Sequence, residues 1–143
     1  MVKRTRSKRI DRSQASRYAE AGRVFLESAR TLSDIADDTS PYGNAIALLS
    51  IHAAISYTDA LTIAFAEQKS ADQHVKAVDN LRAALGSRVD DAQAKILRQI
   101  LQPKDTVSYQ GTFYGLKDGR ALLKKAEGFC RWAKDTYEAR PSI

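Results

Sequence analysis

Residues 40–68, SPYGNAIALLSIHAAISYTDALTIAFAEQ, decide the fold of this protein. Asp59 is the only strongly charged side chain before Glu67 in this stretch, and apolar residues occupy both faces of the helix that the spacing predicts. A helix that is apolar nearly all round is usually buried on most sides. We therefore expect a central helix here, with Ser40 as its N-cap and Pro41 at its first helical position.

Other helices are predicted from apolar residues that recur at intervals of three and four. They are expected at residues 13–36, 70–85, 89–101 and 117–138. A capping box at 70–73 opens the second of these, and Gly86 ends it with a left-handed residue. Pro103 ends the third, because the residue before a proline disfavours the helical conformation.

The segment before the last helix has a different pattern. Residues 103–115, PKDTVSYQGTFYG, lack helical spacing, and we expect an extended loop or a short hairpin there. The predicted fold class is therefore all-α: an antiparallel bundle of four to five helices, residues 13–140, with a long loop before the last helix.

Length and composition describe an ordinary globular chain. The 143 residues, 43% of them hydrophobic and 28% charged, suit one domain. No stretch approaches 18 unbroken apolar residues, so we predict no membrane span and a cytoplasmic protein. The single cysteine, Cys130, excludes an internal disulfide and Cys-rich metal centres, and fits a reducing compartment.

Most of the net charge of +6 comes from the N-terminal segment. Residues 1–12 contain one acid, Asp11, and six bases: Lys3, Arg4, Arg6, Lys8, Arg9 and Arg12. We expect a basic flexible tail. It can bind phosphate by charge alone, or it can serve only as a solvated terminus.

His52 and Asp59 are the first candidate site. Seven residues on a helix bring two side chains within about 20° of each other, and Ser56 lies between them on the same face. Two interpretations stay open. The stripe is a buried polar network that fixes helix register, or it borders a shallow pocket in which Asp59 orients His52 for acid–base chemistry.

His74 is the other histidine and follows the loop after the central helix. With His52 and Asp59 it would complete a set of two histidines and one carboxylate. No Glu-x-x-His or His-x-x-x-His pair supports a metal site, so we expect no metal and no cofactor. Glycine-rich phosphate loops and nucleophile elbows are also absent from the sequence.

Lys104 and Tyr109, in the segment before the last helix, are candidates for nucleic-acid or phosphate contacts. Lys104 can hold a phosphate, and Tyr109 can stack or donate a hydrogen bond. The alternative is a surface loop whose aromatic residues cover the end of the bundle.

Three stretches together resemble the HEPN superfamily: AIALLSIHAAISYTDALTIAF, KSADQHVKAVDNLRAAL, and KDTVSYQGTFYG before a final helix. The resemblance covers roughly residues 15–138 and is closest to small bacterial single-domain members. It implies a helical bundle, a homodimer, and a toxin–antitoxin, defence or RNA-processing context with a nucleotidyltransferase or toxin/antitoxin protein as partner.

The chain departs from that family at its ribonuclease motif, in which Arg precedes His by five to seven positions. Neither His52 nor His74 has such an arginine; Lys69 stands five residues before His74. Lysine does not replace a bidentate arginine. We therefore expect a non-catalytic nucleic-acid- or partner-binding module. The alternative left open is a divergent ribonuclease or nucleotide-processing enzyme that uses His52 or His74.

Overall fold

The computed structural model describes residues 7–70, 76–109 and 113–141. These residues are all-α apart from one two-stranded ribbon. Its helices are α1 Ala15–Ile35, α2 Gly43–Ala66, α3 Ala77–Leu85, α4 Asp91–Leu101, α5 Lys104–Tyr109 and α6 Leu116–Glu138. The strands are β1 Ser7–Arg9 and β2 Gln68–Ser70, and single 3-10 turns lie at 12–14 and 86–88.

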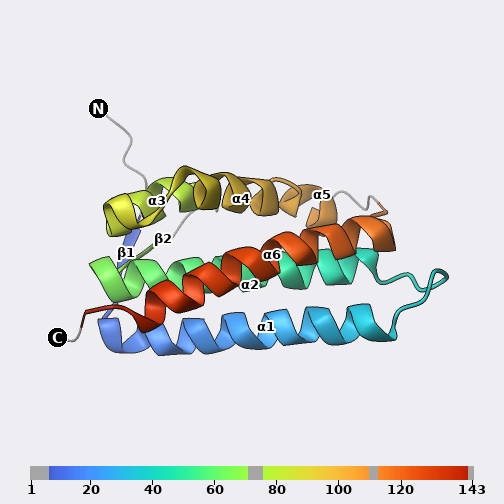
Figure 1. Ribbon diagram of the computed structural model, residues 1–143, viewed down its shortest axis with the longest axis horizontal. Helices are drawn as coiled ribbons and strands as arrows, with labels where there is room; N and C mark the ends of the chain where they lie inside the picture. Colours follow the sequence, from blue (N-terminus) through green and yellow to red (C-terminus); the bar gives the residue numbers. More distant parts are fainter. Residues whose placement is uncertain (1–6, 71–75, 110–112, 142–143) are drawn as a thin grey trace.

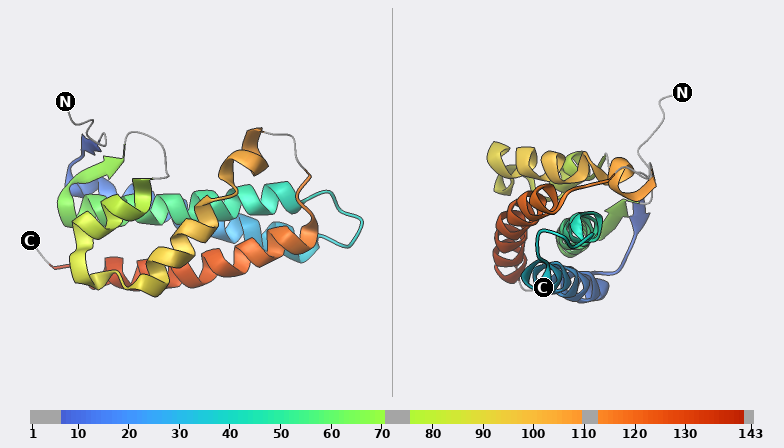
Figure 2. Two further views of the ribbon diagram at one scale, coloured as in Figure 1. Left: turned by 90° about the horizontal axis from the view of Figure 1, so that it is seen from above. Right: turned by 90° about the vertical axis from the view of Figure 1, so that its right-hand side faces the viewer.

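The helices form an up-down-up-down bundle (Figure 1). Helix α2 returns beside α1; α3 crosses the end of the bundle that carries the ribbon; α4 and α5 lead back along the bundle; and α6 then runs in the same direction as α2 (Figure 2). The predicted all-α antiparallel bundle is confirmed, with its third leg divided into three helices. The end-on view in Figure 2 shows α2 enclosed by α1, α6 and the α3–α4 leg, with the β1–β2 ribbon on its remaining side.

Helix α2 is the core helix that its composition predicts. Seventeen of its 24 residues are buried, including Ile46, Ile51 and Leu61. By length and composition alone it could cross a membrane, but 83% of its most apolar window is covered by the rest of the protein. Its buried hydroxyls are satisfied locally: Ser50 and Thr58 each donate to the carbonyl four residues earlier.

Two glycines allow the N-terminal ends of α2 and α6 to touch. A Cβ atom on Gly119 would lie 2.6 Å from the Gly43 carbonyl oxygen, and one on Gly43 would lie 1.8 Å from the Tyr114 carbonyl oxygen. Both distances are too short for any side chain. Alanines continue the contact between α2 and α6 toward their C-terminal ends; Ala126 and Ala133 are fully buried there.

The predicted cap of the central helix is wrong. Helix α2 begins at Gly43, and its N-cap residue, Tyr42, makes no side-chain hydrogen bond. Ser40 lies in a turn organised by Asp37, whose carboxylate accepts from the Thr39 N–H at 2.9 Å, while the Ser40 hydroxyl accepts from the Asp37 N–H. This local turn occupies the hydroxyl that a cap would need.

The expectation of a flexible tail over residues 1–12 is wrong for residues 7–12. Strand β1 pairs antiparallel with β2, with Lys8 opposite Lys69, and Asp11 caps the following 3-10 turn. The predicted helix start at Ser70 is also wrong, because Ser70 belongs to β2 and α3 begins only at Ala77. The chain enters β2 through Glu67, whose φ of 52° ends α2.

Helix α5 corrects the prediction of a loop or hairpin at 103–115. The Pro103 carbonyl accepts from the Val107 N–H at 2.9 Å, so Pro103 opens a short helix after α4 has ended at Leu101. Proline suits a first turn because its φ is already helical, and Asp105 there favours the positive end of the helix dipole. Gly86 ends α3 as predicted and has a positive φ of 60°, but its ψ of -128° is not that of the left-handed helical residue that was expected.

Candidate functional site

His52 and Asp59 lie on the face of α2 that neighbours α1, α5 and the β1–β2 ribbon. The His52 ring lies 5.5 Å from the ring of Phe25 in α1, and its charge is influenced by Lys104 of α5. Asp59, two turns later, is influenced by Lys69 of β2. Neighbours from three other elements therefore surround this one face of α2.

His52 is half-buried beside a positive charge. Burial lowers the pKa of its imidazole, and Lys104 lowers that pKa further. Both effects disfavour the imidazolium, so the ring is neutral at pH 7. A neutral imidazole can donate a hydrogen bond to a ligand or accept one from it.

Asp59 is buried, with 7% of its surface exposed, and no hydrogen bond reaches its carboxyl group from the residues that the structure describes. Burial raises the pKa of this group to about 7, and the nearby Lys69 opposes that rise. A carboxyl group in this setting is partly protonated at neutral pH, in contrast to surface aspartates.

His52 and Asp59 share a face, as predicted, but the structure does not bring them together. Seven residues of helix separate them by about 10 Å along the axis, which is beyond hydrogen-bonding reach. Neither group contributes to the pKa shift of the other. Asp59 therefore cannot orient His52 directly, and no network joins these two groups to Ser56 within the described residues.

Lys104 is held near His52 by the way α5 joins α2. The Asn44 side chain donates to the Val107 carbonyl of α5 at 3.4 Å and accepts from the Tyr114 N–H at 2.8 Å. Val107 is buried against the core. The sequence identified Lys104 but not Asn44, and a lone asparagine in the first turn of a helix carries no pattern that would reveal this role.

Of the predicted N-terminal basic residues, the structure describes the side chains of Arg9 and Arg12. Both lie at the end of the bundle that carries the β1–β2 ribbon, which we call the ribbon end. Arg9 and Arg12 both bind the carboxylate of Glu67, and Arg12 also donates to the Ala64 carbonyl at 3.0 Å. The Arg9 side chain remains 83% exposed. The Ile10 N–H also donates to the Glu67 carbonyl. Together these bonds hold residues 9–12 against the C-terminal end of α2.

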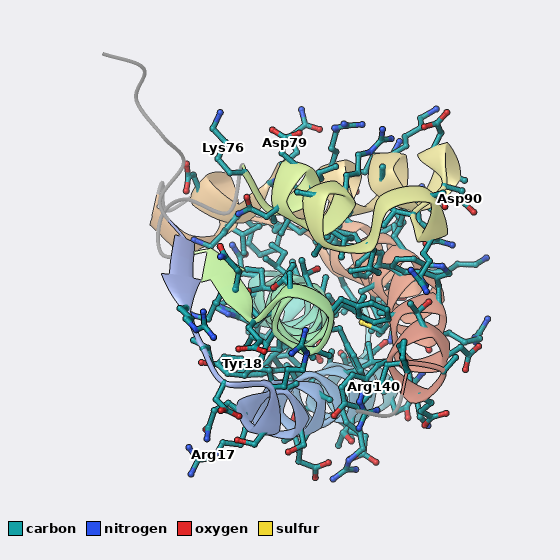
Figure 3. All side chains as sticks on the ribbon, turned by 90° about the vertical axis from the view of Figure 1, so that its left-hand side faces the viewer. Arg17, Tyr18, Lys76, Asp79, Asp90 and Arg140 are labelled. Carbon is teal, nitrogen blue, oxygen red and sulfur yellow. The ribbon has the colours of Figure 1, made fainter. Side chains whose placement is uncertain are left out.

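An aromatic ring lies among the cations of this end. The Lys69 ammonium lies 5.5 Å from the centre of the Tyr18 ring, and Tyr18 is partly exposed. Figure 3 shows Arg17 and Lys76 on the two sides of the ribbon, with Tyr18 between α1 and α2. Arg17 and Lys76 are both exposed. No periodic pattern in the sequence would have grouped these four residues.

Several predicted site residues lie outside the part of the chain that the structure describes. Lys3, Arg4, Arg6 and His74 are among them, as are the side chains of Lys8 and Tyr109. Within the described ranges, no group of three His, Cys, Asp or Glu residues is placed to hold a metal ion.

Cys130 and Arg120 both contribute to the fold rather than to the candidate site. Cys130 is buried in the core, and burial raises the pKa of its thiol to about 12, so it is no nucleophile. Arg120 donates to the carbonyls of Ser33 and Ala36 at the end of α1.

Comparison with known proteins gave no match to a family model, a curated protein or a solved structure. The resemblance to the HEPN superfamily, and the homodimer that it implies, therefore stay predictions.

Proposed function

We propose that the protein is a non-catalytic helical-bundle module that binds nucleic acid through the ribbon end of the bundle. The observation that carries this proposal is the contact of the Lys69 ammonium with the Tyr18 ring, beside a strand that continues the basic N-terminal segment; Arg17 and Lys76 lie further out on the two sides of the ribbon. Cations that track a phosphate backbone, with an aromatic ring among them for base stacking, are typical of single-stranded nucleic-acid binding.

Two acids at this end already accept hydrogen bonds from within the protein. Glu67 already binds Arg9 and Arg12, and the Asp11 carboxylate accepts from the Ser13 N–H. Asp79, in the first turn of α3, is the remaining acid labelled beside Lys76 in Figure 3. Pairing of β1 with β2 holds Arg9, whose side chain is 83% exposed, at this same end of the bundle.

The test is a binding titration with a fluorescently labelled single-stranded oligonucleotide. The double variant Arg17→Gln/Lys76→Gln removes two exposed cations beside the ribbon. The matched control Lys124→Gln/Lys125→Gln removes two exposed cations from α6, which lies on the opposite side of α2 (Figure 2). We expect only the first variant to bind more weakly. Equal binding by both variants and the wild type would refute the proposal.

A second candidate function is a divergent ribonuclease, and the neutral imidazole of His52 favours it. An unprotonated histidine beside Lys104 has the elements of a general base next to a phosphate-binding cation. RNA cleavage by the wild type, lost in His52→Gln without loss of stability, would support this function. Equal cleavage by the variant and the wild type, or none by either, would remove His52 as a catalytic residue.

A further inference from the structure

Helix α1 exposes a row of uncharged side chains along its outer side. A groove of about 480 Å³ follows this row and is bounded by Leu49 of α2. Val24 and Ile35, which line the groove, are 45% and 67% exposed, and the exposed hydroxyl residues Ser28 and Thr31 lie between them. Scattered apolar residues are ordinary on a protein surface, whereas apolar residues gathered along one groove mark a binding surface.

The spacing of this row is that of a surface on which another helix packs. Val24, Ser28, Thr31 and Ile35 are separated by four, three and four residues, which is the alternation of the a and d positions in a heptad. They form one stripe, which we call the α1 seam, with a length of about 16 Å, or roughly three helical turns. A stripe of this length beside a groove suits an amphipathic helix that places its own apolar residues in the groove.

A row of acids borders the α1 seam. Glu20, Glu27 and Asp34 recur every seven residues, each directly before an a position of the heptad. Among the residues that line the groove in the described part of the chain, Glu27 alone carries a charge. Arg23 binds both glutamates from the same helix, but their side chains remain 62% and 59% exposed. The acid row is therefore accessible to a partner that approaches the seam.

We propose that the α1 seam docks a basic amphipathic helix of a partner protein. The apolar residues of that helix lie in the groove between Val24, Ile35 and Leu49, and its lysine or arginine side chains face the acid row. Charges that flank the apolar seam of packed helices set the choice of partner, and an acid row favours a basic one. Arg30 does not oppose this choice, because it binds Glu127 of α6.

A second copy of this chain fits the α1 seam less well than a basic helix does. A two-fold dimer brings the same surface of both subunits together, so each side of the interface would carry the acid row. Like charges placed opposite each other act against such a complex. The seam also ends before Arg17, which lies at the ribbon end, so docking here does not depend on nucleic-acid binding there.

The experiment titrates the full chain into two synthetic, fluorescently labelled helical peptides. Both peptides have leucine at the a and d positions of three heptads; one has lysine and the other glutamate at the flanking positions. Each is used below the concentration at which it self-associates. We expect saturable binding of the lysine peptide and binding of the glutamate peptide that is at least about tenfold weaker. Equal binding of the two peptides, or no binding of the lysine peptide, would overturn the proposal.

Substitutions in α1 locate the site. Val24→Gln/Ile35→Gln removes apolar groups at two exposed positions and should weaken the lysine peptide at least about tenfold. Asp34→Asn should weaken it about threefold, whereas the matched control Asp135→Asn, at an exposed position of α6, should leave it unchanged. If the double variant binds the lysine peptide as tightly as the wild type does, the peptide binds elsewhere and the seam is refuted.

A measurement of molecular mass distinguishes a partner helix from a second copy. Light scattering after gel filtration should give the same mass for the wild type and for Val24→Gln/Ile35→Gln, with the same unfolding midpoint. A wild-type dimer that this variant converts into a folded monomer would show that a second copy covers the seam, and would overturn the proposal.

Discussion

The Asn44 side chain accepts a hydrogen bond from the Tyr114 backbone N–H at 2.8 Å, and so joins the first turn of α2 to the segment that precedes α6. The same side chain donates to the Val107 carbonyl of α5. One asparagine thus ties α5 and the segment before α6 to the first turn of α2, and α5 carries Lys104, whose charge lowers the pKa of His52.

Replacing Asn44 by alanine should affect both stability and the candidate site. Loss of two partly buried hydrogen bonds should lower the free energy of unfolding by about 1–3 kcal/mol. If α5 moves away, Lys104 no longer disfavours the imidazolium, and the pKa of His52 should rise. Urea unfolding and NMR titration of His52 measure the two effects. An unchanged His52 pKa in a destabilised variant would show that Asn44 does not position Lys104.

The contact between α2 and α6 predicts opposite effects of the same substitution at two glycines of α6. Gly119→Ala places a methyl group 2.6 Å from the Gly43 carbonyl oxygen and should destabilise the protein by about 1–3 kcal/mol. Gly128→Ala meets no atom within 4 Å and should stabilise it by up to about 1 kcal/mol through helix propensity. Thermal unfolding of both variants checks this. A stable Gly119→Ala variant would contradict the close approach of the two helices.

Arg9 and Arg12 both attach the N-terminal segment to Glu67, and we expect their replacement by alanine to lower stability by unequal amounts. Arg12→Ala removes a hydrogen bond to the end of α2 as well as an ion pair. Because the side chain is partly covered, this variant should lower the free energy of unfolding by about 1 kcal/mol. Arg9→Ala removes an exposed ion pair to the same Glu67 and should cost less than about 0.5 kcal/mol. Hydrogen exchange at the Ile10 N–H should accelerate more in Arg12→Ala. Equal exchange in both variants would contradict the role given to Arg12.

Asp59 predicts a pH dependence of stability. Its pKa is about 7 in the folded protein, mainly through burial, against 3.8 for the unperturbed group. The folded state therefore keeps a proton that the unfolded chain releases. The contribution of protonated Asp59 to the free energy of unfolding is complete below about pH 4 and is lost as the pH rises to 7. This loss has an upper limit of about 4 kcal/mol.

Asp59→Asn removes this titration, so its stability should fall less than that of the wild type between pH 4 and pH 8. Urea unfolding across this range measures the difference, and Asp135→Asn, at an exposed position of α6, is the matched control. Parallel stability profiles for Asp59→Asn and the wild type would show that Asp59 keeps an ordinary pKa.

The long elements of this fold could be predicted because each carries a periodic signal over many residues. Helix α2 shows this best, since a helix apolar on all sides has to lie inside the bundle. Strands β1 and β2 could not be predicted, because three residues carry no period and their pairing joins segments about 60 positions apart. The pairing of Ser70 with Ser7 in the ribbon could not be foreseen for the same reason; residues 71–73 of the predicted capping box lie outside the described residues.

In the candidate site, too, features within one helix could be predicted and contacts between elements could not. Helical geometry correctly placed His52 and Asp59 on one face, since both belong to one element. Their actual partners, Lys104 for His52 and Lys69 for Asp59, come from other elements and depend on tertiary packing. Helix α5 was missed because Val107, Tyr109 and Phe113 imitate the alternation of a strand, although Val107 alone of these is seen to be buried.

The salt dependence of oligonucleotide binding tests the central claim most directly. Removing residues 1–6 takes away Lys3, Arg4 and Arg6 and leaves β1 and its bonds to Glu67 in place, so the unfolding midpoint serves as the control for folding. Each phosphate contact on a single strand contributes about 0.7 to the slope of log K against log salt. The account predicts a slope shallower by about 2 in the shortened chain with the same unfolding midpoint. An identical slope and affinity in the two chains, or no binding by either, would contradict it.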